Sequence, residues 1–288
     1  MKKIVIPFLV GLVLSCTQAP AQKTVFKEHI SKDFSISNAS GNNVLAIYNI
    51  NGFITVKGYD GDKVLLEVDK TLSAGNEELL EAAKQEFKVN LEQKDDSVLA
   101  YITEPFDSRP NRNNKNWGNR DKNRYDFRLE FTVTVPYSMN LLVSTVNGGD
   151  VTIEDVTGSL KVSNVNGAIK IANAKGTSDI KTINGNVEAN YLIVPPGESQ
   201  FKTLNGDVIV TYPQTLSADC QFKSFNGEFF TDFPDVATLP VTVVKNQENS
   251  PGKTIYKLNT ETSIRIGNGG KTFRFETFNG NIYLKKQS

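Results

Sequence analysis

Apolar and polar positions recur along this chain in one phrase centred on Asn-Gly. Counting from the Asn of each copy, the fourth and first preceding residues are apolar, and the second preceding residue is small and polar. In six of the seven copies an apolar residue also follows three places after the Asn. Five copies lie between Leu141 and Phe230, at spacings of 19, 18, 21 and 21 residues, and one lies near each end of the chain. The copies are Asn51-Gly52, Asn147-Gly148, Asn166-Gly167, Asn184-Gly185, Asn205-Gly206, Asn226-Gly227 and Asn279-Gly280.

A period near twenty residues indicates a stacked repeat, in which each copy supplies a strand, a corner and a second strand. Alternating apolar and polar residues bury one side of each strand, and Asn-Gly favours the positive φ of a tight corner. Each period also holds a second turn about halfway, such as Lys175-Gly176 or Pro195-Pro196-Gly197. We therefore predict an all-β chain folded as a parallel β-solenoid of about twenty-residue coils, with one short covering helix.

Stacked coils would align the recurring Asn side chains as a hydrogen-bonded ladder, which gives Asn a structural reason to recur. The alternative is an antiparallel meander in which each Asn-Gly closes a two-residue hairpin. The positions of the amides separate these two architectures, because a column of amides fits stacked coils and scattered amides do not.

The first residues have the pattern of an export segment. Lys2 and Lys3 precede an apolar run over residues 4–14 that is too short to span a membrane as a helix. Residues 1–21 are therefore predicted to be a signal peptide. Residues 13–16 resemble a bacterial lipobox, in which cleavage makes Cys16 the lipidated first residue, whereas residues 19–21 resemble an ordinary site that leaves Gln22 first. Both exits place the mature protein outside the cytoplasm, at the outer membrane or cell surface as a lipoprotein, otherwise in the periplasm or secreted.

Three stretches lack the phrase. Residues 22–43 are polar and turn-rich, which predicts a tether or an edge strand. Residues 76–87 predict a helix that covers the β core, because Asn76 can cap it and apolar residues lie on one face. Residues 104–126 predict a mobile surface insertion, whose Trp117 is a candidate contact for a sugar or another ring. The rest of the span 44–288 is assigned to the solenoid domain.

The composition excludes several kinds of binding and catalytic site. Lys plus Arg and Asp plus Glu number 32 each, and this balance argues against a basic nucleic-acid-binding face. Cys16 lies in the export segment and Cys220 reads as a small buried residue, so the mature chain has no intramolecular disulfide available. His29 is the only histidine and stands apart from any nucleophile motif. No His or Cys cluster has metal-ligand spacing and no phosphate loop occurs, so no catalytic residue, metal or cofactor is predicted.

Carboxylates leave one catalytic alternative open. Asp150, Glu154 and Asp155 cluster near the first coil of the central repeats, and Asp207 and Glu228 follow their Asn-Gly corners. Enzymes that act on polysaccharides work through such groups. The residues that follow each Gly are varied, however. We therefore interpret the corner acids as solvated side chains and not as a paired acid and base.

The recurrent Thr-x-Asn-Gly set, with Val135-Pro136 and the Leu-x-Val of residues 141–143 before it, resembles the putative adhesin family of bacterial envelope proteins. This family is a domain of unknown function related to the head domains of autotransporter-like adhesins. The resemblance covers residues 44–284 approximately, implies a β-solenoid in the cell envelope, and supplies no catalytic residues.

We therefore expect a non-catalytic, exported adhesin or surface-binding scaffold. Its expected partners are envelope proteins or glycans, without nucleic acid, and its expected contact with the membrane is a lipid anchor at Cys16 alone. One alternative is a carbohydrate-active enzyme on a β-helix, and another is an envelope-sensing or assembly protein.

Overall fold

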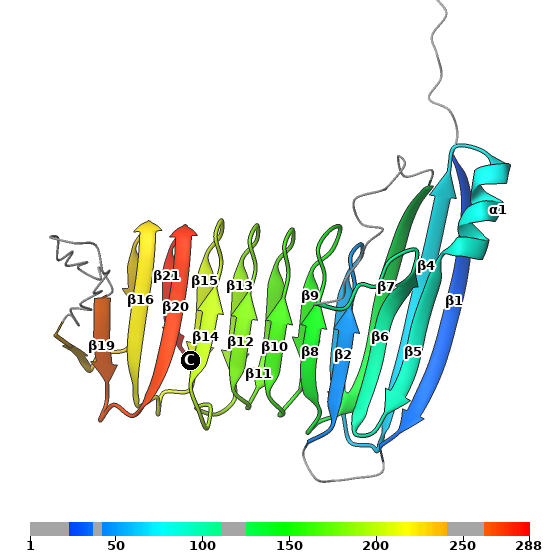
Figure 1. Ribbon diagram of the computed structural model, residues 1–288. Coiled ribbons are helices and arrows are strands. Elements are labelled where there is room, and N and C mark those ends of the chain that lie inside the picture. The colour runs from blue at the N-terminus through cyan, green and yellow to red at the C-terminus, as the bar shows by residue number, and fades with distance from the viewer. Residues whose placement is uncertain (1–22, 37–41, 111–124, 241–261) are drawn as a thin grey trace, which may run out of the picture.

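The structure is a computed structural model that describes residues 23–36, 42–110, 125–240 and 262–288. The predictions for residues 1–21, for Cys16 and for Trp117 lie outside these ranges, as does most of the insertion expected at 104–126. The described chain forms two large, mostly parallel β-sheets that face each other across one hydrophobic core (Figure 1). The predicted all-β class is confirmed.

Sheet A contains ten strands and sheet B contains eleven. In spatial order, sheet A consists of β1 (Thr24–Ser35), β4 (Lys63–Ala74), β7 (Tyr125–Pro136), β3 (Ile54–Tyr59), β9 (Val151–Glu154), β11 (Ile169–Ala174), β13 (Val187–Tyr191), β15 (Val208–Tyr212), β21 (Ile282–Lys286) and β17 (Phe229–Thr231). Sheet B consists of β18 (Val236–Thr238), β19 (Thr262–Ile266), β16 (Ala218–Asn226), β20 (Lys271–Asn279), β14 (Ser199–Lys202), β12 (Ser178–Lys181), β10 (Leu160–Ser163), β8 (Asn140–Ser144), β2 (Val44–Tyr48), β6 (Ser97–Glu104) and β5 (Lys88–Lys94).

Each copy of the repeat phrase carries the chain from sheet B to sheet A. The strands before and after Asn147, β8 and β9, belong to different sheets, and β8 pairs in parallel with the next sheet B strand, β10. The sheet A strands β9, β11, β13 and β15 pair in parallel in the same way. The Asn-Gly phrases therefore do not close hairpins, and the alternative prediction of an antiparallel meander is wrong for the repeats.

The core follows the apolar positions of the phrase. The residue four places before each Asn is at most 3% exposed in all seven copies, which are Ile47, Val143, Val162, Ile180, Phe201, Phe222 and Phe275. Towards the C-terminal end these side chains become a stack of rings. Phe275 lies between Phe201, with ring centroids 5.4 Å apart, and Phe222, at 5.1 Å.

The order of the repeats in space differs from their order in the chain. The last pair of strands, β20 and β21, lies between the pair β14–β15 and the pair β16–β17 in both sheets. Strand β19 covers the other side of β16 and pairs with it in an antiparallel direction. The final copy of the phrase therefore fills a gap inside the stack, and the copy at Asn226 forms the end of it.

The N-terminal end is closed by longer, partly antiparallel strands. Strand β1 pairs with β4 over all twelve of its residues, so most of the tether predicted at 22–43 is instead the edge strand that was its alternative. Helix α1 (Glu77–Glu86) contacts β4 and β1 and buries Leu80 and Ala83, with Asn76 as its N-cap, as the sequence indicated. Within the described ranges, no helix has the length and apolar content needed to cross a bilayer.

Replacing Phe275 by Ala tests whether the ring stack holds the C-terminal repeats together. The substitution leaves a cavity at a position that is 1% exposed, so the free energy of unfolding is expected to fall by about 3–5 kcal/mol. Chemical denaturation followed by circular dichroism measures the change. Phe225→Ala is the matched control, because that ring is 74% exposed and its loss is expected to cost less than about 1 kcal/mol. Equal losses for the two variants would contradict the assigned core.

Candidate functional site

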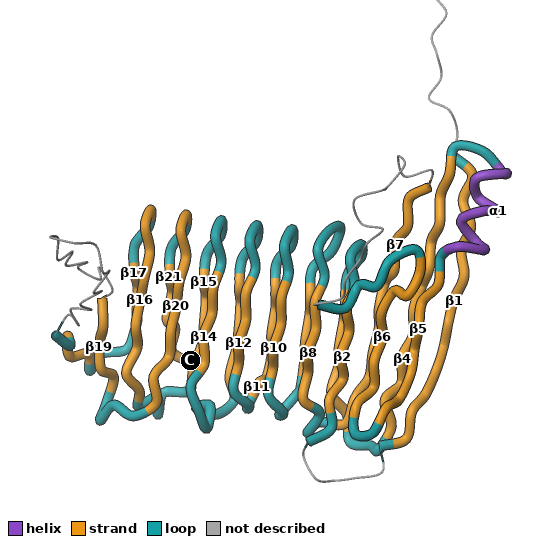
Figure 2. The backbone as a smooth tube through the Cα atoms, viewed as in Figure 1, coloured by secondary structure: helices purple, strands orange, loops and turns teal. Residues whose placement is uncertain are grey.

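The recurring Asn side chains form a ladder along the edge where the end of each sheet B strand turns into sheet A, the upper row of corners in Figure 2. Each amide Nδ2 donates to Oδ1 of the previous Asn at 2.7–2.8 Å, in the spatial order Asn147, Asn166, Asn184, Asn205, Asn279 and Asn226. Asn51 extends the row through a backbone bridge to Asn147. The structure therefore contains the predicted column of amides, with the last two members in the opposite order to the chain.

The small polar residue two places before each Asn has a specific partner, and it is buried in every copy except at Ser224, which is half-buried. The Thr182 hydroxyl donates to the carbonyl oxygen of Gly167 at 2.9 Å, and the Thr203 hydroxyl donates to that of Gly185 at 2.8 Å. Thr145, Thr277 and Ser224 make the equivalent bond, and Asn164 makes it with its amide. Each such side chain thereby satisfies a buried carbonyl of the neighbouring coil.

The Gly of the phrase permits the close approach that this bond requires. A Cβ at Gly206 would lie 2.2 Å from the carbonyl oxygen of Gly185, and Gly206 has a φ of +152°. Both the contact and the backbone conformation exclude a larger residue. The pattern Thr-x-Asn-Gly is therefore explained position by position, except for the residue written x.

A second ladder runs beside the first, and the sequence did not reveal it. Its acceptors are four residues with a side-chain oxygen that follow a Gly, at positions 150, 186, 207 and 281. Oδ1 of Asp150 accepts the Ala168 N–H at 2.8 Å. Oδ1 of Asp207 accepts the Asn281 N–H at 2.7 Å. The interpretation of the corner acids as merely solvated is therefore wrong for Asp150 and Asp207, because each caps a backbone amide of the next coil. The only shared signal is a side-chain oxygen, supplied by either Asp or Asn.

The other residues considered for catalysis lie apart from one another. Glu154 pairs with Lys57 at 3.7 Å on sheet A. His29 is on β1, where a hydrogen bond from its ring to Asp69 raises its pKa. Cys220 is fully buried on β16, and burial raises the pKa of its thiol to about 12, which keeps it protonated and unreactive. Among the described residues, no three His, Cys, Asp or Glu side chains are grouped so as to hold a metal ion.

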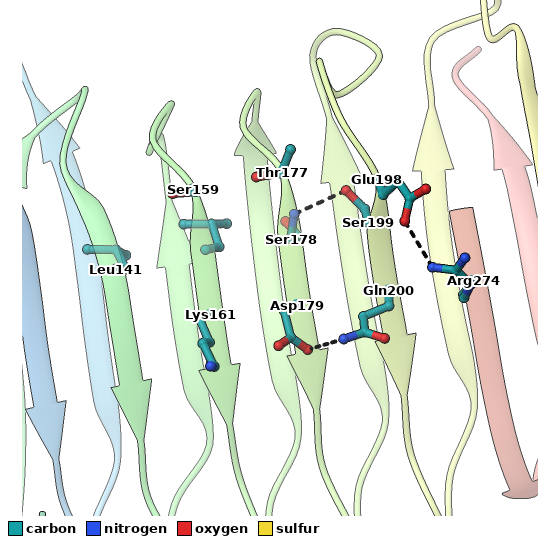
Figure 3. A pocket seen from close by; sticks show the side chains of 11 residues that line it. Leu141, Ser159, Lys161, Thr177, Ser178, Asp179, Glu198, Ser199, Gln200 and Arg274 are labelled. Carbon is teal, nitrogen blue, oxygen red and sulfur yellow. Dashed lines mark hydrogen bonds and ion pairs between the residues drawn. The ribbon is translucent and has the colours of Figure 1, made fainter. Parts of the chain in front are cut away.

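The outer face of sheet B carries an open trough of 320 Å³, close to the start of its strands (Figure 3). Eleven residues line it, namely Leu141, Ser159, Leu160, Lys161, Thr177, Ser178, Asp179, Glu198, Ser199, Gln200 and Arg274. The strand register places four long side chains in one row across four neighbouring strands, in the order Lys161, Asp179, Gln200 and Arg274. We call this set the trough row.

The trough row is held in place by side-chain contacts. Gln200 Nε2 donates to Asp179 Oδ1 at 2.9 Å, and the Arg274 guanidinium contacts a Glu198 carboxylate oxygen at 3.0 Å, as Figure 3 shows. Beneath the row, the Ser178 N–H donates to the Ser199 hydroxyl at 3.1 Å, and both serines are buried. Lys161 is exposed and has no ion pair within the described part of the chain. Along the stacking direction the trough thus presents a positive, a negative, an amide and a second positive group, at an interval of about 4.8 Å.

One family model and several solved structures are similar to this chain. The family model described as Toastrack DUF4097 matches residues 127–283. A "putative cell adhesion protein" from Clostridium sporogenes is 12% identical over 91% of this chain and 100% of its own, with a TM-score of 0.42. A "putative adhesin" from Bacteroides fragilis is 12% identical over 90% of this chain and 97% of its own, with a TM-score of 0.31. No curated protein matches the chain. Similarity at this level does not assign a function.

Gly206→Ala tests the close approach at the corner. The added methyl group meets the Gly185 carbonyl and forces a strained φ, so we expect the free energy of unfolding to fall by about 3 kcal/mol. Gly75→Ala is the control, because a Cβ there has no neighbouring atom within 4 Å and its effect is expected within about 1 kcal/mol of zero. Urea titration of both variants gives the comparison, and a harmless Gly206→Ala would refute the role of the contact.

Proposed function

The chain belongs to the Toastrack DUF4097 family, and on that premise we propose that it is a non-catalytic, exported envelope protein that works as an adhesin or surface-binding scaffold. In this proposal the two sheets are the walls of a β-solenoid of about twenty-residue coils, whose outer faces carry the binding groups. An extended polysaccharide lies along the stacking direction in the trough of sheet B.

The trough row carries this proposal. Its four side chains come from four neighbouring strands, so one ligand running across the strands contacts them in succession. A charged or amide group at each strand suits the hydroxyl and acidic groups that line a polysaccharide. The trough is open. Asp179 pairs with Gln200 and Arg274 with Glu198, so binding exchanges those hydrogen bonds for bonds to the ligand, and Lys161 binds without such an exchange. Affinity then grows with the number of strands that the ligand crosses.

A non-catalytic role agrees with how the described carboxylates are used. Asp150 and Asp207 hold backbone amides, Glu154 pairs with Lys57, and Asp179 and Glu198 accept bonds from neighbouring side chains. A glycosidase instead needs two carboxyl groups that are free to face the scissile bond at a separation of about 5–10 Å.

Two matched double variants test binding in the trough. Asp179→Ala with Arg274→Ala removes one acid and one base from the trough row, and we expect the dissociation constant for a bound polysaccharide to rise at least tenfold. Lys170→Ala with Glu188→Ala removes an acid and a base from adjacent strands of sheet A and is expected to change nothing. Calorimetry against a panel of purified bacterial polysaccharides makes the measurement. Failure to bind any polysaccharide, or equal losses for the two variants, would reject the trough.

The same panel distinguishes binding from catalysis. Release of reducing ends that is lost in Asp150→Ala or Glu154→Ala would overturn the non-catalytic proposal in favour of a carbohydrate-active enzyme. Binding without release supports the scaffold.

We also propose that the chain is a lipoprotein anchored through Cys16. When cells that express the protein grow with radioactive palmitate, we expect the protein to become labelled. The Cys16→Ala variant is expected to be exported without the label. A chain that begins at Gln22 and carries no label would instead establish ordinary cleavage and a protein free of any lipid.

A further inference from the structure

The residue immediately before each Asn of the ladder is apolar. Ile50, before Asn51, is half-buried and packs against the core, but at the C-terminal end of the ladder this side chain is exposed. Four of these side chains are large and 42–74% exposed, namely Ile183, Leu204, Phe278 and Phe225. Beyond Ile50, the row in the spatial order of the ladder is Val146, Val165, Ile183, Leu204, Phe278 and Phe225, which we call the corner ridge. The two valines are half-buried, so exposure and size both increase towards the C-terminal end of the stack.

Stacking of the coils does not account for the corner ridge. The buried hydroxyl, the amide ladder and the Gly contact are made by the other three positions of the phrase, so a polar residue before the Asn would leave each of them intact. The ridge is nevertheless continuous, and the rings of Phe225 and Phe278 stack with centroids 4.8 Å apart. The four large side chains expose on the order of 400 Å². An apolar patch of this size is often functional.

The shape and size of the ridge restrict the partner. The ridge is a narrow, convex line of side chains where the two sheets meet, and its area is about half of the roughly 800 Å² per partner that a stable protein interface buries. A second copy of the chain or a flat protein surface is therefore a poor fit. A convex apolar line suits a lipid bilayer, because its side chains enter the acyl region while the flanks remain among the headgroups.

The charged residues beside the ridge indicate what kind of lipid surface the ridge would bind and which flank would face it. On the sheet B flank, Lys181, Lys202 and Lys223 stand two residues before the ridge residue of their coils and are exposed. Glu276 lies in the same line and pairs with Lys202 at 3.1 Å and Lys223 at 3.8 Å, so the flank keeps a positive excess. Lysines near an apolar insertion favour anionic headgroups.

The other flank is acidic and turns away from such a surface. Asp207 and Glu228 lie on the sheet A side of the corner, two residues after their Asn. The Asp207 carboxylate accepts the Asn281 N–H, and Glu228 is exposed at the end of the stack. The sheet B side of the corner is therefore the side that faces an anionic surface, and the sheet A side faces away from it.

The start of the described chain lies at the same edge of the molecule. Thr24 pairs with Ala74, and Ala74 pairs with Tyr125, the first residue of β7. Strand β7 runs in parallel with β3 and begins six residues before the pair Phe131–Ile54, which follows the Asn51 corner. The start of β1 therefore lies at the corner edge, as Figure 1 shows. A chain of the length that separates Cys16 from Lys23 spans at most about 25 Å. A lipid at Cys16 would bring this edge to the membrane.

We propose that the corner ridge binds the surface of an anionic lipid bilayer, with Phe225 and Phe278 entering the acyl region and the lysines of the sheet B flank facing the headgroups. This contact adds to the anchor at Cys16, which was expected to be the sole contact with the membrane. The ridge is a surface separate from the trough. The proposed export determines only which membrane the ridge would meet in the cell, and lipid binding itself does not depend on it.

Vesicle flotation tests the proposal with the mature chain carrying Cys16→Ala, which has no acyl group. The probe is a vesicle of 70% phosphatidylcholine and 30% phosphatidylglycerol, and a vesicle of phosphatidylcholine alone is the comparison. We expect binding to the first, at least tenfold weaker binding to the second, and at least a tenfold loss in Phe225→Ser with Phe278→Ser. The matched control is Leu192→Ser with Ile193→Ser, two exposed apolar residues outside the ridge that are 46% and 49% exposed, and it is expected to float like the unchanged chain.

The result is read alongside circular dichroism, which is expected to be the same for all chains because the substituted residues are exposed. Absence of binding to anionic vesicles, or equal binding by the two double variants, would overturn the proposal. A concentration-dependent dimer that disappears in Phe225→Ser with Phe278→Ser, without vesicle binding, would overturn it in favour of a second copy. None of these outcomes bears on the trough, whose polysaccharide binding is measured without lipid.

Discussion

The separation of neighbouring coils at the Asn-Gly corner determines the rest of the structure. A Thr hydroxyl reaches the Gly carbonyl of the coil beside it only because that carbonyl also lies against a residue without a Cβ. The amide ladder then fixes the register of the same pair of coils. Each bond contributes only about 1 kcal/mol, but the same group of bonds recurs at successive rungs. This repetition brings the apolar residues four places upstream into one continuous core.

Much of the fold could be predicted because each repeat contains the residues that determine its own strands and corner. The buried position, the small polar position and the Asn-Gly corner are all read within eight residues, and the structure places them as expected. The order of the last two repeats could not be predicted, because the phrases at Asn226 and Asn279 are chemically equivalent and either fits beside Asn205. The choice depends on β19, which pairs with β16 and joins it through Arg265 and Asp219 at 2.7 and 2.9 Å. That hydrogen-bonded pair holds the pKa of Asp219 below its usual value.

Two further features lacked a readable signal for physical reasons. Strand β1 is an edge strand with one buried residue, Phe34, so its sequence does not alternate as a half-buried strand does. The second ladder requires only a side-chain oxygen after the Gly, which Asp150 and Asp207 provide as carboxylates and Asn186 and Asn281 as amides. No single residue type recurs at the position after the Gly, so the sequence pattern does not indicate the ladder. The candidate trough depends on register across four strands, and register follows from the stack and not from any local motif.

The corner also separates structural from functional positions within a single phrase. Three of its four residues are committed to the neighbouring coil, by a buried hydroxyl, by an amide in the ladder and by the absence of a Cβ. The fourth, between Thr and Asn, makes no such contact. In the four copies where it is large and 42–74% exposed, burial gives an apolar residue no advantage. Its apolar character in those four copies therefore needs a cause outside the stack. A surface that meets the whole edge at once, such as a bilayer, supplies that cause without any change in the coils behind it.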